Sequence, residues 1–174
     1  MTEDQIVFTL CDQIREGKFN IESLNKIRVD NSSSNVHGLG DLIGANDFDI
    51  FKDTTAWNTH PKQLVNIAGG TRPDIVLRSK KNENRIIIEA KCGAPLRAPK
   101  ETSQVVRYLL HLLATSLQTP DSNAGEIRRA VLLAAPDEWF ENKKNNEAWH
   151  HFRTTYEPLA RGFGVTLGEI RIAR

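Results

Sequence analysis

The sequence lacks the marks of several large protein classes. Its two cysteines, Cys11 and Cys92, are too few for a disulfide framework and have no cysteine or histidine partners at zinc spacing. No apolar stretch approaches the length of a membrane span, and the start, Met1 to Asp4, has neither the basic residues nor the apolar core of a secretory signal. We therefore expect a cytoplasmic protein with no membrane partner.

Charge and aromatic content give no global sign of nucleic-acid binding. The 23 lysines and arginines nearly balance the 22 aspartates and glutamates, so the net charge is +1 and any attraction for phosphates must come from local clusters. Aromatic residues make up 7% of the chain and the three tryptophans are scattered, so no stacking platform for single strands is evident. With 174 residues, 39% of them hydrophobic, the chain is expected to form a single domain over residues 1–174.

Two short β-rich segments carry the most informative residues. Asp74 lies in the run Arg72–Leu77, and Glu89 and Lys91 close the run Arg85–Lys91, with a polar, turn-forming segment between the two runs. Side chains alternate across a strand, so Glu89 and Lys91 project from the same face. Pairing of the two runs as a hairpin brings Asp74 beside them. The pattern therefore predicts two carboxylates and one ammonium in a small volume.

This trio suits phosphodiester hydrolysis. Carboxylate oxygens bind a hard cation such as Mg²⁺, which keeps several waters and needs few protein ligands. A metal ion polarises the phosphoryl oxygen and lowers the pKa of a bound water. A neighbouring lysine such as Lys91 orients or deprotonates that water and offsets the charge that develops on the phosphate.

The two motifs, Pro73-Asp74 and Glu89-Ala90-Lys91, resemble the signature of the PD-(D/E)xK nuclease superfamily. The resemblance covers about residues 63–135 and implies an α/β domain of the restriction-endonuclease-like fold, with a mixed central β-sheet flanked by helices. It implies that Asp74, Glu89 and Lys91 are catalytic. It also implies that Asp74, Glu89 and Ala90 bind the metal ion, Mg²⁺ with Mn²⁺ as a substitute.

Gln104 and Tyr108 form a Gln-x-x-x-Tyr pair that resembles a helix motif of the RecB-like branch of this superfamily. Residues four apart share one face of a helix. The resemblance implies that Gln104 is catalytic, near the active-site water, and that Tyr108 lies near the substrate or the motif strand. Without the resemblance, Tyr108 fits the edge of an amphipathic core, and His111 a surface or satisfied histidine. The expected buried stripe of this helix is Val106, Leu109, Leu110, Leu113 and Leu117.

Two simpler interpretations compete with the nuclease site. Asp74 is also an ordinary turn residue after proline, and Glu89 with Lys91 an ordinary exposed pair on an edge strand. Against this, the run Ile86–Ile88 predicts a strand buried on both faces, where charges need partners or a metal. A second match, Pro136-Asp137 followed by Glu141-Asn142-Lys143, fails because too few residues separate its acids for two paired strands.

Further site residues are assigned by proximity and pattern. Many members of the superfamily carry an additional acid near the start of the domain, and Glu16, which ends the first expected helix, is preferred here over Glu3, Asp12, Glu22, Asp49 and Asp53. Arg97 and Lys100 are the first choices for substrate phosphates because they follow the motif closely. Other candidates are Lys80, Lys81, Arg85, Arg128 and Arg129. For each, a solvated surface charge is the alternative.

The remaining elements follow from periodicity and turn signals. Helices are expected at Glu3–Glu16, from Asn20 to Ile27, and at Asn145–Arg161, and Asp30–Gly44 is expected to be a loop. Strands are expected at Phe48–Phe51, Leu64–Ile67, Ala130–Ala135 and Val165–Ile172.

The leading hypothesis is a Mg²⁺-dependent deoxyribonuclease of the restriction, repair or mobile-element type, from a microbe or virus. It acts as a homodimer if it cuts both strands of a duplex, or as a subunit of a larger defence or repair complex. The second hypothesis is a catalytically inactive nuclease-fold module that binds nucleic acid or another protein. The third is a chance motif in an unrelated α/β protein. Retention of Asp74, Glu89 and Lys91 together favours catalysis.

Overall fold

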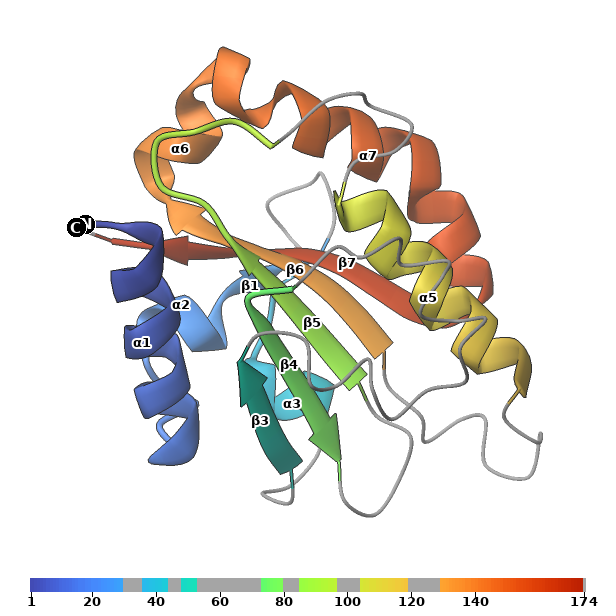
Figure 1. The fold of residues 1–174 in the computed structure, drawn as a ribbon, viewed down its shortest axis with the longest axis horizontal. Coiled ribbons are helices and arrows are strands. Elements are labelled where there is room, and N and C mark those ends of the chain that lie inside the picture. The colour runs from blue at the N-terminus through green and yellow to red at the C-terminus, as the bar shows by residue number, and fades with distance from the viewer. Residues whose placement is uncertain are drawn as a thin grey trace.

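Seven described strands form a mixed sheet at the centre of the computed structural model, with helices on both of its faces (Figure 1). The strand order is β2-β1-β7-β6-β5-β4-β3. This confirms the predicted α/β class with a mixed sheet flanked by helices. The structure describes residues 1–29, 36–43, 48–52, 73–79, 85–96, 104–118 and 129–173.

The described strands are β1 (Ile27–Arg28), β2 (Val36–His37), β3 (Phe48–Lys52), β4 (Ile75–Ser79), β5 (Arg85–Ala90), β6 (Arg129–Pro136) and β7 (Val165–Ile172). The described helices are α1 (Glu3–Arg15), α2 (Glu22–Asn25), α3 (Leu39–Ile43), α5 (Gln104–Gln118), α6 (Asp137–Glu141) and α7 (Lys143–Gly162).

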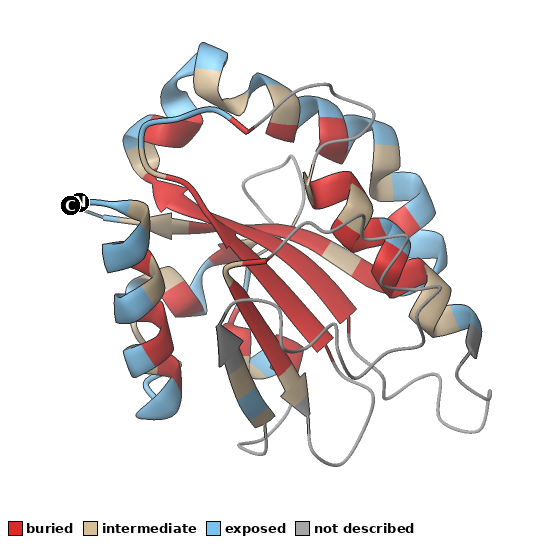
Figure 2. Ribbon diagram, viewed as in Figure 1, coloured by how far each residue is buried: buried red, intermediate tan, exposed pale blue. Residues whose placement is uncertain are grey.

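Three parallel strands, β5, β6 and β7, lie at the middle of the sheet, and antiparallel strands extend it on both sides. Every residue of β5 and β6 is buried (Figure 2). Parallel strands covered on both faces read as continuous apolar runs, which is why the run Ile86–Ile88 predicted a doubly buried strand. Successive isoleucines alternate between the two faces, with Ile87 on one and Ile86 and Ile88 on the other.

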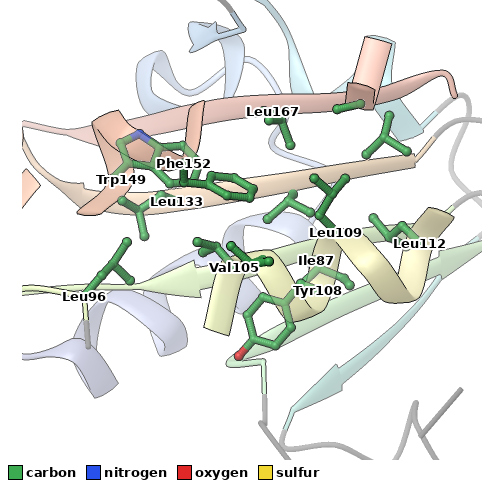
Figure 3. Packing of buried hydrophobic residues seen from close by; sticks show 14 of the residues in the cluster. Ile87, Leu96, Val105, Tyr108, Leu109, Leu112, Leu133, Trp149, Phe152 and Leu167 are labelled. Atoms are coloured by element: carbon green, nitrogen blue, oxygen red, sulfur yellow. The ribbon is translucent and has the colours of Figure 1, made fainter. Parts of the chain in front are cut away.

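One face of the sheet, here called the α5/α7 face, carries Val76, Ile87, Leu133 and Leu167. Helices α5, α6 and α7 cover it, and Figure 3 shows side chains of α5 and α7 packed on the strands. Burial of this apolar area is the main stabilising contribution, at about 25 cal/mol per Å² removed from water.

The opposite face, here called the α1 face, packs against α1, α2 and α3. Ile6, Leu10 and Ile14 recur at helical spacing on α1 and are buried there. Gly168 of β7 also faces this side, and an added Cβ would lie 2.9 Å from side-chain atoms of both Ile27 and Leu132. The absence of a side chain at Gly168 therefore leaves room for Ile27 and for the pairing of β1 with β7.

The predicted first helix is confirmed. Thr2 and Gln5 form a reciprocal capping box at its start, which satisfies backbone donors that the helix itself leaves open. Gly17, just beyond its end, has a φ of 66°, a left-handed conformation that favours glycine. The position of the cap matters for the site because it fixes Glu3 in the first turn.

Several predicted boundaries differ from the structure. The second helix is shorter than predicted, is preceded by Ile21 and not capped by Asn20, and Ile27 belongs to β1. The expected loop Asp30–Gly44 contains β2 and α3, which its glycines and polar residues concealed. The short helix α6 was not predicted. The expected strand Leu64–Ile67 lies outside the described residues.

The strands predicted around Phe48, Ala130 and Val165 and the helix predicted from Asn145 are all present. Among the described residues, no helix is both long enough and apolar enough to cross a bilayer.

Candidate active site

The pairing of β4 with β5 places Asp74 opposite Glu89. Ile75 pairs with Ile88 in the antiparallel ladder, so the next residues outward are Asp74 and Glu89. The backbone N–H of Ala90 donates to Oδ2 of Asp74 at 2.7 Å, which anchors the aspartate against the end of β5. The hairpin and the strand alternation predicted from the sequence therefore bring the two carboxylates together.

Glu89 is buried, with 2% of its surface exposed, and both of its carboxylate oxygens accept hydrogen bonds. Nζ of Lys91 donates to Oε1 at 2.9 Å, and Oη of Tyr108 donates to Oε2 at 2.9 Å. A carboxylate has about four lone-pair sites, so two donors leave Glu89 able to bind a cation as well.

Helix α5 delivers Tyr108 to this carboxylate. Val105, Leu109 and Leu112 pack on the sheet beside Tyr108 (Figure 3), so the helix lies with its Tyr108 side against β5. The predicted stripe was partly wrong, because Leu110 and Leu117 are exposed. Periodicity alone favoured the leucines, whereas the structure buries the phenol, which has a hydrogen-bond partner on the sheet.

The electrostatic environment raises the pKa of Glu89 to about 7. Burial is the main cause because it disfavours the charged form, and the neighbouring charge of Asp74 acts in the same direction. Lys91 and the hydroxyl of Tyr108 oppose the shift. Near neutral pH, Glu89 is therefore poised between its protonated and ionised forms.

The pKa values of the two partners of Glu89 are shifted as well. For Lys91, burial is the largest single effect and lowers the pKa, but the charge and hydrogen bond of Glu89, together with the charges of Glu3 and Asp74, outweigh it, so the net pKa is raised. Burial and the charge of Glu89 raise the pKa of Tyr108. Lys91 therefore stays an ammonium and Tyr108 stays a hydrogen-bond donor at neutral pH.

Glu3, at the start of α1, is the first-helix acid that reaches this cluster. Its Oε2 lies 3.7 Å from Nζ of Lys91, and its Oε1 accepts from the backbone N–H of Cys92 at 3.3 Å. The expectation that Glu16 supplies the additional acid was wrong, because Glu16 is far from this cluster. Glu16 lies beyond the other end of α1, about 20 Å along the helix at 1.5 Å per residue, and pairs with Lys18.

The net charge of this cluster suits a cation. Asp74, Glu89 and Glu3 contribute three negative charges when ionised and Lys91 one positive charge, which leaves −2. Within the described ranges, no group of three or more acidic, histidine or cysteine side chains has the arrangement of a metal cage. Mg²⁺ does not need one, since it retains several waters and is bound through one or two carboxylates. The oxygen donors present therefore fit Mg²⁺.

The other predicted site residues fall in three positions. Gln104 is the first residue of α5, one turn before Tyr108 on the same face, and is half-buried. Tyr108 is fully buried on the motif strand, so of the two places that the resemblance implied, substrate and strand, it occupies the strand. Arg97 and Lys100 lie outside the described residues.

Two arginines considered as phosphate contacts are buried instead. Arg85 and Arg129 pair across β5 and β6 at the opposite end of these strands from Glu89. Nη1 of Arg85 lies 3.4 Å from Nε2 of His111, which is itself buried. Neither arginine is a surface charge, and the histidine is not a surface residue.

The second sequence match, Pro136-Asp137 with Glu141-Asn142-Lys143, does not form a nuclease motif on two paired strands. Asp137 and Glu141 lie on the short helix α6, one turn apart, and no strand carries Glu141. Glu3 was among the acids weighed from the sequence, but only the packing of α1 on the sheet brings the start of α1 to the end of β5.

Comparison of this chain with protein-family models, with curated proteins and with solved structures finds no match. The resemblance to the PD-(D/E)xK superfamily therefore depends on Asp74, Glu89, Lys91 and the helix pair Gln104 and Tyr108 alone.

Proposed function

We propose that this protein is a Mg²⁺-dependent nuclease that hydrolyses phosphodiester bonds, with DNA as its substrate. The observation that carries the proposal is the position of Glu89, opposite Asp74 in the sheet and 2.9 Å from the ammonium of Lys91. Two carboxylates and a lysine at the end of a buried strand provide a cation site and a positive charge for the phosphate.

Asp74, Glu89 and Ala90 are the residues that would hold the metal ion. When bound, Mg²⁺ supplies Lewis acidity toward the phosphoryl oxygen and makes a bound water more acidic, and Mn²⁺ supplies the same chemistry. The Ala90 N–H orients Asp74, and Tyr108 and Lys91 fix both oxygens of Glu89. The protein thus presents its carboxylates in one arrangement before substrate arrives.

Lys91 has the direct role toward the substrate. Its ammonium, held by Glu89 and near Glu3, stabilises the negative charge that builds on the phosphate and orients the water. In the reaction the water gives up a proton as its oxygen bonds to phosphorus, the bond from phosphorus to the leaving sugar oxygen breaks, and that oxygen takes up a proton. Gln104, on the same helix face as Tyr108, borders the place of this water.

The biological role belongs to the same proposal. A restriction, repair or mobile-element enzyme would act as a homodimer on duplex DNA, or as one subunit of a larger complex.

A decisive experiment incubates the full chain with circular and linear, single- and double-stranded DNA and with RNA, in Mg²⁺, Mn²⁺ or EDTA. We expect cleavage of DNA with either metal and none in EDTA. Glu89→Gln and Asp74→Asn should abolish cleavage while the far-UV circular dichroism spectrum stays unchanged. Glu141→Gln, an equal charge change on the exposed surface of α6, serves as the control. Wild-type cleavage by Glu89→Gln would exclude Glu89 as a ligand.

One observation favours the second candidate, a nuclease-fold module that binds nucleic acid without cutting it. Glu89 is buried and has two hydrogen-bond donors from the protein itself, so its burial is compensated without a metal. Calorimetric titration with Mg²⁺ separates the two candidates. Binding that is lost in Asp74→Asn supports the enzyme, and nucleic-acid binding with no metal binding and no cleavage supports the module.

A further inference from the structure

Strand β7 repeats the charge pattern of β5. Glu169 and Arg171 lie two residues apart on β7, as Glu89 and Lys91 do on and just beyond β5. The register aligns the two patterns, because Glu89 pairs with Leu133 of β6 and Leu133 pairs with Glu169. Both glutamates therefore lie in one row on the α5/α7 face, two strands apart.

The two glutamates also have matching surroundings. Glu89 accepts from Lys91 and from Tyr108 of α5, and Oε2 of Glu169 accepts from Nε of Arg171 at 3.1 Å. Oε1 of Glu169 accepts from Nε1 of Trp149 at 3.0 Å, and Trp149 belongs to α7. Each buried carboxylate is thus held by a cation two residues along its strand and by an aromatic donor from the covering helix.

The two clusters differ in charge. Arg153 of α7 adds a second guanidinium to Glu169, with Nη1 3.2 Å from Oε1. Asp137 and Glu169 together carry −2, and Arg153 and Arg171 carry +2, so this cluster sums to zero, whereas the cluster around Glu89 sums to −2. The β7 cluster therefore does not favour a metal ion.

Donors exceed acceptors in the β7 cluster. Arg153 is almost fully buried, with 3% of its side chain exposed, and its Nε and Nη2 atoms have no hydrogen-bond partner among the residues that the structure describes. Guanidinium groups with unused N–H donors attract anions, and arginine suits phosphate through its planar fork of donors. The chemistry of this cluster points to an anionic ligand.

Arg171 is the cation of the cluster that reaches solvent, whereas Arg153 is buried. Its side chain is 24% exposed, its Nη1 lies 3.5 Å from Oδ1 of Asp137, and its guanidinium carbon lies 4.7 Å from the ring centre of Phe140. Glu169, Asp137 and Phe140 hold the guanidinium from three sides. A fixed arginine loses less side-chain entropy when it binds a phosphate.

Arg171 also lies in register with the proposed active site. Ala90 pairs with Ala134 and Ala134 with Ile170, and Ala135 pairs with Arg171 one residue further. The N–H of Lys91 donates to the carbonyl of Ala134, so the parallel ladder continues to Lys91. Two strand spacings, about 10 Å, therefore separate the backbones of Lys91 and Arg171.

We propose that Arg171 binds a backbone phosphate of the nucleic-acid substrate, next to the phosphate held at Asp74, Glu89 and Lys91. This inference depends on the proposed function. Glu169 is a positioning residue that holds Arg171, Arg153 in turn donates to Glu169, and Asp137 is an anion at the rim that competes with the phosphate for Nη1. The Pro136-Asp137 motif, unsuited to a second nuclease site, thus belongs to substrate binding.

The test measures binding without cleavage. A fluorescently labelled mixed-sequence DNA, as single strand and as duplex, is titrated with the full chain in EDTA between about 50 and 200 mM salt. Arg171→Ala should weaken binding about tenfold, as loss of a charge-assisted hydrogen bond implies. It should also lower the slope of log affinity against log salt by about one. Arg171→Lys should retain the salt slope.

Asp137→Asn should change the DNA affinity in the opposite direction. Loss of the rim carboxylate removes both a competitor for Nη1 and a repulsion toward the phosphate, so binding should become about two- to fivefold tighter. Glu138→Gln, in the same first turn of α6, is the control with equal net charge. Arg161→Ala, an exposed arginine on α7 paired with Glu157, is the control for Arg171→Ala.

A purely structural role for the cluster gives a different result. Arg171→Ala and Asp137→Asn would then both lower thermal stability, and neither would change binding more than its control. That outcome overturns the inference and leaves the nuclease proposal intact. If the wild-type chain binds neither form of DNA in EDTA or in Ca²⁺, the nuclease proposal fails and this inference fails with it.

Discussion

The hydroxyl of Tyr108 donates to Oε2 of Glu89 at 2.9 Å, and this bond joins the helix motif to the strand motif. The ring of Tyr108 is fully buried between α5 and the sheet. The bond also lowers the pKa of Glu89 against the larger effect of burial, which raises it. Tyr108 therefore influences the charge of the site while its ring packs in the core.

Tyr108→Phe should keep the packing and lose the hydroxyl. Without this donor the pKa of Glu89 rises further, so a higher pH is needed to ionise the carboxylate. We expect cleavage to slow about tenfold near neutral pH, as expected for a lost hydrogen bond to a charged group, and the pH–rate profile to move to higher pH. Tyr156→Phe on α7 is the control. A slower rate with an unmoved profile would contradict the assigned role.

The pH dependence of stability should reveal the buried carboxylate. The folded-state pKa of Glu89, about 7, is above its ordinary value, so folding favours the protonated form. The contribution of Glu89 to the free energy of unfolding is therefore greatest below about pH 4.5. It falls as the pH rises to about 7, by about 3 kcal/mol in total. Urea unfolding of wild type and Glu89→Gln in EDTA measures this. The free energy of unfolding of Glu89→Gln should increase relative to that of wild type as the pH rises over that range. A difference that does not change with pH would contradict the raised pKa.

Mg²⁺ binding should release a proton from Glu89. A cation binds the ionised carboxylate, so affinity should increase with pH and level off above about pH 7, where Glu89 is already ionised. Titration calorimetry in two buffers of different ionisation enthalpy measures the released protons. Asp74→Asn should remove most of the binding. A Mg²⁺ affinity that stays constant between about pH 5 and 8, a range that brackets this pKa, would exclude Glu89 from the metal site.

Lys91→Ala should separate cleavage from binding. Loss of one electrostatic or proton-transfer contribution costs about 10²–10⁴ in rate, whereas most nucleic-acid affinity should remain. The double variant Arg97→Ala with Lys100→Ala should show the reverse, weaker binding and a smaller salt slope. Gel-based cleavage and fluorescence anisotropy measure the two effects. Equal loss of binding and cleavage in Lys91→Ala would favour the inactive module.

Glu3→Gln and Glu16→Gln form a matched pair on one helix with the same change in net charge. Glu3 lies 3.7 Å from the ammonium of Lys91, and Glu16 is at the far end of α1. Loss of the Glu3 charge should weaken Mg²⁺ binding about two- to fivefold, a modest effect because its side chain is partly exposed and screened. Glu16→Gln should leave binding unchanged. Equal affinities of the two variants would show that Glu3 is outside the site.

The sequence predicted those parts of the site that depend on local pattern. The apolar run before Glu89 and the alternation of side chains were enough to place Asp74, Glu89 and Lys91 on one hairpin. Helical spacing predicted α5 and buried Val106, Leu109 and Leu113 correctly, but it missed the buried Tyr108, because hydrophobicity does not report that a phenol will find a buried carboxylate.

Features that depend on the order of strands could not be predicted. Glu3 meets Lys91 because α1 packs beside β5, and Glu169 lines up with Glu89 because β6 lies between β5 and β7. In both cases the two residues are about 80 or more positions apart in the sequence, and local propensity carries no information about contacts over that separation. The resemblance to a nuclease family located the motif strand but not these neighbours.

The bond from the Ala90 amide to Asp74 also gives Asp74 a role at the end of the sheet. A side chain, in place of a strand carbonyl, accepts the amide proton where the β4–β5 ladder ends. Asp74→Ala should therefore let this end of the hairpin fray, so that the Ala90 amide exchanges with solvent faster, whereas Asp74→Asn keeps an acceptor oxygen. The same side chain thus limits fraying of the hairpin and supplies a carboxylate for the cation. The two roles can be separated by comparing amide exchange at Ala90 with metal affinity in the two variants.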